Sequence, residues 1–176
     1  MKLRKLTLTA VLTAAALTVF VLECQLPPLT AIAGIKPGLS NIFTLFTMQT
    51  LGPGWAACLL LVRILLGNII TGQISALFYS LSGGLAAYLL MLLLRRALRG
   101  SLLWVQSVFC AIAHNLGQLT AAAIITKTPA IWYYLPVLTL AAIISGALTG
   151  LCAQLILSRL RKTRLLPEEE KEESNG

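Results

Sequence analysis

Residues Leu85–Leu94 read LAAYLLMLLL, and the basic pair Arg95 and Arg96 follows directly. A continuously apolar run of this kind is typical of a helix in a lipid bilayer, because the strands of a membrane β-barrel alternate apolar and polar residues. Similar runs fill most of the 176-residue chain, and hydrophobic residues make up 57% of it. The sequence therefore predicts an all-α protein, a polytopic bundle of transmembrane helices.

Six transmembrane helices are expected, at about residues 6–23, 39–51, 55–70, 75–94, 102–126 and 131–158. The second is the shortest, because about 13 residues cover only about 20 Å, whereas the hydrocarbon core is about 30 Å thick. The turn Leu51–Gly54, with the sequence LGPG, separates it from the third, since glycine and proline end helices. We therefore expect part of the second helix to lie within protein.

The basic residues gather at the ends of the apolar runs. One cluster precedes the first helix, one follows the fourth and one follows the sixth; their members are Lys2, Arg4 and Lys5; Arg95, Arg96 and Arg99; and Arg159, Arg161, Lys162 and Arg164. Only Lys36 and Lys127 fall on the opposite side. The positive-inside rule then predicts that both termini are cytoplasmic and that the protein is a multi-pass protein of the cell membrane. A net charge of +8 arranged in this way does not indicate nucleic-acid binding.

One folded domain is expected, a six-helix transmembrane domain over residues 1–166. A disordered acidic cytoplasmic tail over residues 167–176 should follow it, because this segment is a run of charges. A cleaved signal peptide is the alternative for the N-terminus, with Ala31–Ala33 as the cleavage site. We favour a transmembrane helix, since the apolar run of about 17 residues exceeds the usual signal core of about 7–15.

The composition removes most catalytic chemistry. The sequence has no aspartate, and Glu23 is the only acidic residue before residue 167. The four cysteines are far apart without a CxxC pair and His114 is the only histidine, so neither a disulfide framework nor a metal site is predicted. The nucleotide-binding pattern GxxxxGK[ST] does not occur. We expect no catalytic residue, no metal and no cofactor.

Polar residues at membrane depth are costly, which makes them the candidates for ligand binding. The first outer loop and the start of the second helix offer Glu23, Lys36 and Asn41, and Ser40 with Asn41 can cap that helix. An ordinary connecting loop explains these residues equally well. Arg63, in the middle of the third helix, needs an anion, and we favour a structural pair with Glu23 over an anionic ligand.

The fifth helix carries a polar or thiol side chain at every fourth position. These residues form one stripe that should face the bundle interior, with Asn115 alongside, and they are Gln106, Cys110, His114 and Gln118. Interhelical hydrogen bonds are the favoured explanation of His114. The alternative is a polar ligand group held by His114, Asn115 and Gln118. Tyr133 suits an interfacial aromatic belt or the wall of a cavity at its outer mouth.

Small residues at four-residue spacing predict close helix packing in the fourth and sixth helices, at Gly83 and Ala87 and at Ala142, Gly146 and Gly150. Ala10 and Ala14 have the same spacing in the cytoplasmic half of the first helix. We predict that a partner membrane subunit docks on these two alanines.

The chain resembles the Gx transporter family, whose members are also labelled heptaprenyl diphosphate synthase component I. The resemblance covers roughly residues 23–152, and its main matching stretches are Gly34–Asn41 (GIKPGLSN), Arg63–Gly67 (RILLG), Phe78–Gly84 (FYSLSGG) and Ala113–Gln118 (AHNLGQ). These stretches contain most of the candidate residues above and add Tyr79 to the predicted ligand site. Pro37 stands where the family pattern has leucine.

The two family labels imply different activities. Prenyl synthases bind magnesium diphosphate through aspartate-rich motifs, which this chain lacks, so prenyl transfer is not expected. The layout is similar to the substrate-binding component of energy-coupling factor importers. That resemblance implies capture of a vitamin-, flavin- or quinone-precursor-like molecule from outside, with a membrane coupling subunit and ATPase subunits as partners. The alternative is a non-transporting membrane scaffold of a quinone- or isoprenoid-synthesis or flavin electron-transfer assembly.

Overall fold

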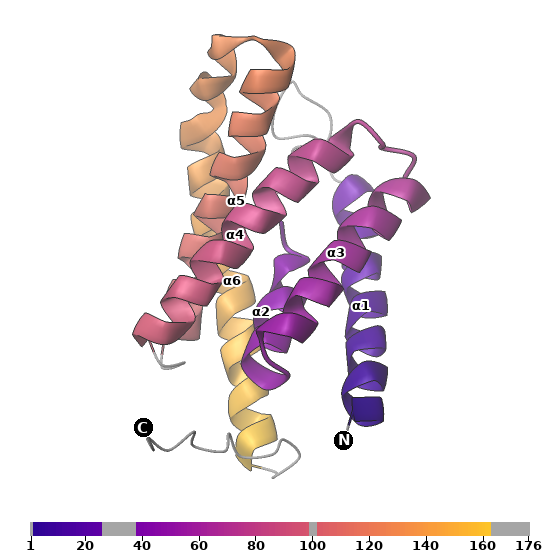
Figure 1. Ribbon diagram of the computed structural model, residues 1–176. Coiled ribbons are helices and arrows are strands. Elements are labelled where there is room, and N and C mark those ends of the chain that lie inside the picture. Colours follow the sequence, from indigo (N-terminus) through magenta and orange to yellow (C-terminus); the bar gives the residue numbers. More distant parts are fainter. Residues whose placement is uncertain (1, 26–37, 99–101, 163–176) are drawn as a thin grey trace, which may run out of the picture.

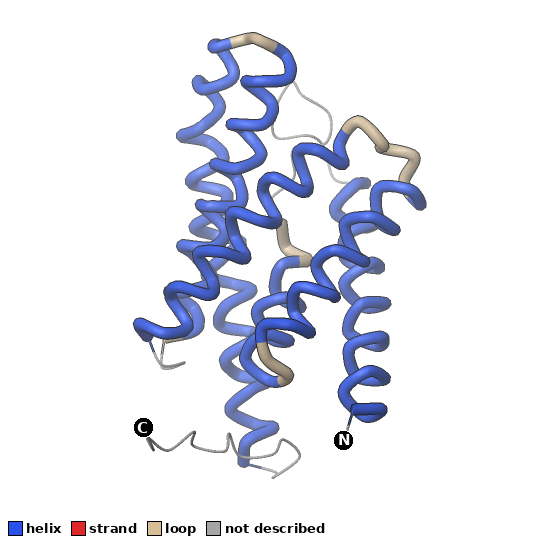
Figure 2. Tube along the Cα trace, in the orientation of Figure 1, coloured by secondary structure: helices blue, strands red, loops and turns tan. Residues whose placement is uncertain are grey.

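The computed structural model describes residues 2–25, 38–98 and 102–162, and within these ranges it is all-helical (Figures 1 and 2). The elements are α1 (Lys2–Gln25), α2 (Asn41–Thr50), α3 (Pro53–Ile70), α4 (Ala76–Leu98), α5 (Leu103–Thr126), the 3-10 helix η1 (Pro129–Tyr134) and α6 (Leu135–Lys162). The predicted all-α class is confirmed. Lys36, the Ala31–Ala33 alternative and the predicted tail lie outside the described residues.

Five of these helices, all except α2, are long and apolar enough to cross a membrane, with η1 continuing into α6. This supports the prediction of a multi-pass membrane protein. The expected count of six complete spans is not confirmed, because α2 has 10 residues and covers only about 15 Å. Each residue of α2 is buried or half-buried, so this helix lies within protein, as its length predicts.

The position of α2 is central. It contacts each of the other five α-helices, whereas in the described part of the chain α1 meets only α2 and α3. Helix α5 packs between α4 and α6. Helix α3 contacts α4 and so joins α1 and α3 to the group of α4, α5 and α6. Figure 1 shows α2 as the short segment in the middle of this arrangement.

Glycines allow α5 to pack closely against both neighbours. A methyl group on Gly83 of α4 would lie 2.7 Å from the His114 carbonyl oxygen, and one on Gly150 of α6 would lie 2.5 Å from the Cα of Trp104. Both distances are too short for a real side chain, so the backbones approach only because these residues are glycine. The close packing predicted from the small-residue spacing is confirmed.

The basic residues gather at one end of the bundle. The start of α1 and the ends of α4 and α6 lie at the lower end in Figure 1, and they carry Lys2, Arg4 and Lys5, Arg95 and Arg96, and Arg159. Lys127 follows α5 at the opposite end. We call the lower end the basic end. This arrangement is the one that the positive-inside argument requires.

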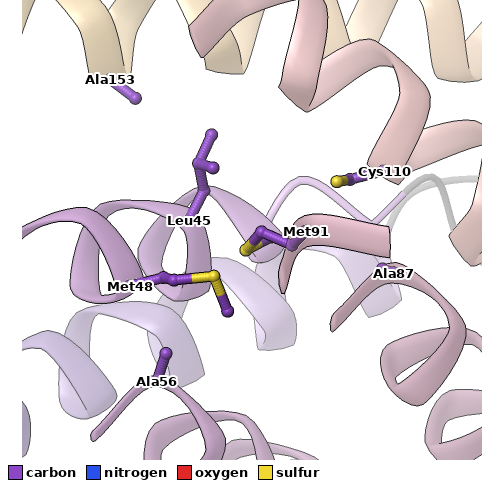
Figure 3. Packing of buried hydrophobic residues seen from close by; sticks show 7 residues of the cluster. All are labelled: Leu45, Met48, Ala56, Ala87, Met91, Cys110 and Ala153. Carbon is purple, nitrogen blue, oxygen red and sulfur yellow. The ribbon is translucent and has the colours of Figure 1, made fainter. Parts of the chain in front are cut away.

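Two apolar clusters occupy different levels of the bundle. The first contains Leu45 and Met48 of α2, Met91 of α4 and Cys110 of α5 (Figure 3). The second, further from the basic end, joins residues of α4, α5, η1 and α6: Ala76, Tyr79, Leu119, Ala122, Ile131 and Leu138. Along α4 and α5 the residues between these clusters are Ser80–Ala86 and Ala111–Gln118, and the candidate site lies at that level.

Candidate functional site

Buried polar side chains from α1, α3, α4 and α5 meet at the start of α2. We call this group the polar centre; its members are Glu23, Ser40, Asn41, Arg63, Ser80 and His114. Asn41 is half-buried, and each of the others is at most 4% exposed. Because polar groups are costly at such depth, their convergence marks the candidate functional site.

Glu23 binds the start of α2. One carboxylate oxygen accepts the Leu39 backbone N–H at 2.6 Å, and the other accepts the Ser40 N–H at 3.2 Å. Backbone N–H groups at the start of a helix have no partner within the helix and carry partial positive charge, so a carboxylate there is stabilising. A residue of α1 therefore caps α2.

The predicted capping of α2 by its own side chains is wrong. Ser40 is the N-cap residue, but its side chain makes no capping hydrogen bond. Its backbone has helical angles, φ −62° and ψ −13°, whereas a capping serine is usually extended. The Ser40 hydroxyl instead accepts a hydrogen bond from Arg63, and Glu23 receives the N–H groups.

Arg63 holds the same helix start from α3. Its Nη1 donates to Ser40 Oγ, and its Nη2 donates to Asn41 Oδ1 at 2.9 Å. The guanidinium carbon also lies 6.0 Å from the centroid of the Phe20 ring, a cation–π distance. The structure thus brings Arg63 and Glu23 to one place, but the hydrogen bonds that each makes among the described residues go to Leu39–Asn41 rather than to each other.

Four atoms of the polar centre have no hydrogen-bond partner in the described part of the chain: Asn41 Nδ2, Arg63 Nε, Ser80 Oγ and His114 Nδ1. Arg63, Ser80 and His114 line one cavity, together with Glu23 and Gln118. The cavity measures about 10 Å³ for the centre of a water-sized sphere, which is room for about one water molecule. Buried polar atoms are almost always satisfied, so a water or a ligand atom belongs there.

Gly38 is required where the chain passes the imidazole. Its φ of +77° is a conformation that side chains disfavour. A methyl group there would also lie 2.9 Å from His114 Cδ2 and 2.9 Å from Asn41 Nδ2. The backbone before α2 therefore lies directly against the His114 ring, which fixes one wall of the cavity.

Of the remaining predicted residues that the structure describes, only Gln118 belongs to this site, as part of the lining of its cavity. Asn115 donates from Nδ2 to the Leu138 carbonyl oxygen at 2.8 Å and so joins α5 to α6. Tyr79 lies in the apolar cluster further from the basic end, and Tyr133 is 86% exposed. Ala10 and Ala14 are exposed on α1, where a partner could reach them.

Sequence reasoning missed Ser80 and Phe20. Ser80 is a polar residue inside an apolar run, and that signal could have selected it. Ser82, two positions later, gives the same signal but donates to the Gly117 carbonyl oxygen instead. Phe20 gives no signal of its own, because nothing local distinguishes an aromatic residue under a guanidinium from one facing lipid.

Comparison with known protein families gives a match for this chain. The model of the family described as heptaprenyl diphosphate synthase component I matches residues 12–156. The chain belongs to this family. The heptaprenyl diphosphate synthase component I match includes every residue of the polar centre, and it confirms the resemblance under that label; the Gx transporter label stays a prediction. No curated protein and no solved structure matches the chain.

Proposed function

We propose that this chain is the membrane component of an assembly that forms or uses an isoprenoid diphosphate, and that it binds a ligand without itself catalysing prenyl transfer. The family description supports the first part, since a component I implies at least one further component. The five long apolar helices and the single basic end support a multi-pass position in the cell membrane with both termini cytoplasmic.

The composition supports a non-catalytic role. Prenyl transfer uses Mg²⁺ on a diphosphate, and Mg²⁺ takes oxygen ligands, chiefly carboxylates. The sequence has no aspartate, and Glu23 is the only side-chain carboxylate outside residues 168–173. Both oxygens of Glu23 accept backbone N–H groups at the start of α2, so this carboxylate serves the fold. The carboxylates for catalysis would come from a partner chain.

The ligand-binding part rests on the polar centre. Arg63, Ser80 and His114 come from three helices; each lines the same cavity, and each has an unsatisfied buried atom. Helix association alone does not account for these atoms, because leaving a buried polar atom unsatisfied costs about 1–3 kcal/mol. The polar end of a ligand would satisfy them.

A second candidate function is a capture subunit for uptake of a small molecule, working with a membrane coupling subunit and ATPases. One observation favours it: α1 packs only on α2 and α3 in the described structure, which leaves Ala10 and Ala14 exposed for a membrane partner. The chain has no nucleotide-binding pattern, so ATP hydrolysis would belong to another subunit. The family description favours the first candidate.

Affinity purification of the full chain from its native membranes in a mild detergent tests both candidates. Mass spectrometry should identify a soluble prenyl synthase chain in stoichiometric amount if the first is correct, and ATPase subunits if the second is correct. Ser80→Ala should lower the amount of any small molecule recovered, whereas Ser158→Ala on the exposed face of α6 should not. Recovery of the chain with neither a partner nor a small molecule would contradict both.

A further inference from the structure

A second cavity lies beside the polar centre. Residues of α2, α4, α5 and α6 line it, among them Asn41, Ser107, Cys110, Ser145 and Thr149. It has the same size as the first, about 10 Å³ for the centre of a water-sized sphere. Gly38 lines both cavities, so they approach each other at the segment just before α2.

The two cavities follow one another along α5. The first contacts His114 and Gln118, whereas the second contacts Ser107, Cys110 and Ala111, about two helical turns closer to the basic end. Gly38 contacts both cavities, and Asn41, three positions later, contacts the second one. A ligand that displaces this short segment would find polar groups on both sides of it.

The charges of the first cavity already balance. Arg63 contributes one positive charge and Glu23 one negative charge, and both line this cavity. An added diphosphate would bring several negative charges that no further cation among the described lining residues offsets. An uncompensated charge is far more costly in such a buried place than an uncharged polar group.

The unsatisfied atoms are suited to oxygen acceptors. Arg63 Nε carries a hydrogen and can only donate, while Ser80 Oγ and His114 Nδ1 can donate or accept. Asn41, which lines the second cavity, also has an unsatisfied donor, Nδ2, while its Oδ1 accepts a hydrogen bond from Arg63. The lining of each cavity thus includes a residue with an unsatisfied donor.

We infer that the two cavities are halves of one binding site for a small uncharged molecule with at least two oxygen acceptors, such as carbonyl groups, and that this site excludes diphosphates. The inference rests on the ligand-binding role proposed above and specifies its ligand. In an assembly that handles an isoprenoid diphosphate, this chain therefore binds a different, uncharged molecule, and the diphosphate belongs to a partner.

Cysteine labelling in native membranes tests the charge preference. Cys110 lines the second cavity, and a variant that keeps it as the only cysteine reports access there. The probes are methyl methanethiosulfonate, which is uncharged, and 2-sulfonatoethyl methanethiosulfonate, which is anionic. A variant with Cys152 as the only cysteine gives the baseline, because Cys152 is exposed on α6.

We expect the ratio of uncharged to anionic labelling rates to be about tenfold higher at Cys110 than at Cys152, since uncompensated charge is disfavoured in the site. Ser80→Cys in a cysteine-free chain should show the same preference, because it reports the first cavity. Glu23→Gln should lower the ratio at Cys110 towards the baseline, as Arg63 then lacks its counter-charge; the first two measurements decide the inference if this variant does not fold.

Equal ratios at Cys110 and Cys152 would overturn the inference, and so would labelling of Cys110 only after denaturation. A charge preference at Cys110 but not at Ser80→Cys would overturn the union of the two cavities. Labelling needs no partner chain. Charge-selective labelling without a co-purifying partner would therefore contradict the proposed assembly but not the site. A co-purifying partner without charge-selective labelling would contradict the site alone.

Discussion

The Glu23 carboxylate of α1 accepts the backbone N–H of Leu39 at 2.6 Å, across 16 positions of sequence. Arg63 of α3 donates to Ser40 and Asn41 of the same segment. Two charged residues from different helices therefore fix the start of α2, a helix of 10 residues that is too short to be stable alone. The centre of the bundle depends on this pair of contacts.

Glu23→Gln should destabilise the protein by about 3 kcal/mol, because it removes the carboxylate at the start of α2 and leaves the buried Arg63 without a counter-charge. The measurement is the unfolding free energy in detergent, followed by circular dichroism. Gln25→Ala, at the exposed end of the same helix, is the control and should be neutral. An unchanged stability for Glu23→Gln would show that the carboxylate charge is not needed.

Arg63→Lys should cost about 1–3 kcal/mol, because one ammonium group cannot reproduce the two separate donors that reach Ser40 and Asn41. Arg96→Lys is the matched control, since Arg96 is exposed at the basic end. The same denaturation measurement compares them. If Arg63→Lys is as stable as the unchanged chain, a positive charge alone suffices and the guanidinium geometry plays no part.

Gly38→Ala separates backbone strain from collision. Both Gly38 and Gly72 have positive φ, +77° and +67°, but a methyl group on Gly72 would meet no described atom within 4 Å. Gly72→Ala should therefore cost only the strain, about 1–2 kcal/mol. Gly38→Ala should cost clearly more, since it also presses on His114 and Asn41. Equal losses in thermal stability would mean that the contact with the imidazole is loose.

The stripe on α5 shows what the sequence predicts well. Spacing of four residues placed Gln106, Cys110, His114 and Gln118 on one face, and all four are buried. Helical periodicity carries this information because a polar side chain in an apolar helix has to face protein. The glycine and alanine spacings of α4 and α6 predicted close helix packing correctly for the same reason, since each spacing is a property of a single helix.

The capping of α2 shows what local sequence does not contain. Ser40 and Asn41 have the residue types of a helix cap. However, the Glu23 carboxylate of α1 accepts the Ser40 N–H, and the Arg63 guanidinium of α3 binds both side-chain oxygens. Such competition is decided by tertiary contacts. Tyr79 likewise came from family resemblance, which indicates that a stretch matters without telling whether each member contacts a ligand or fills the core.

Gly150→Ala should destabilise the α5–α6 packing, because the methyl group would lie 2.5 Å from the Cα of Trp104 and 2.7 Å from Ser107 Cβ. Backbone at such distance cannot yield without separating the helices, so we expect a loss of about 1–3 kcal/mol. Gly54→Ala in the first turn of α3 is the control: it meets no described atom within 4 Å, and alanine favours the helix by up to about 1 kcal/mol. Thermal unfolding that ranks the two variants in the opposite order would contradict the packing.

The double substitution Ala10→Leu and Ala14→Leu tests the predicted docking face on α1. Both alanines are exposed, so larger side chains should leave the stability of the isolated chain unchanged while preventing close approach of a partner helix. We expect recovery of the partner from native membranes to fall at least about fivefold, the effect of losing about 1 kcal/mol of association energy. Val11→Leu, on an exposed position of the same helix, is the control for added bulk. If both variants recover the partner equally, the exposed face of α1 contacts lipid, and any partner has to reach the bundle through another helix.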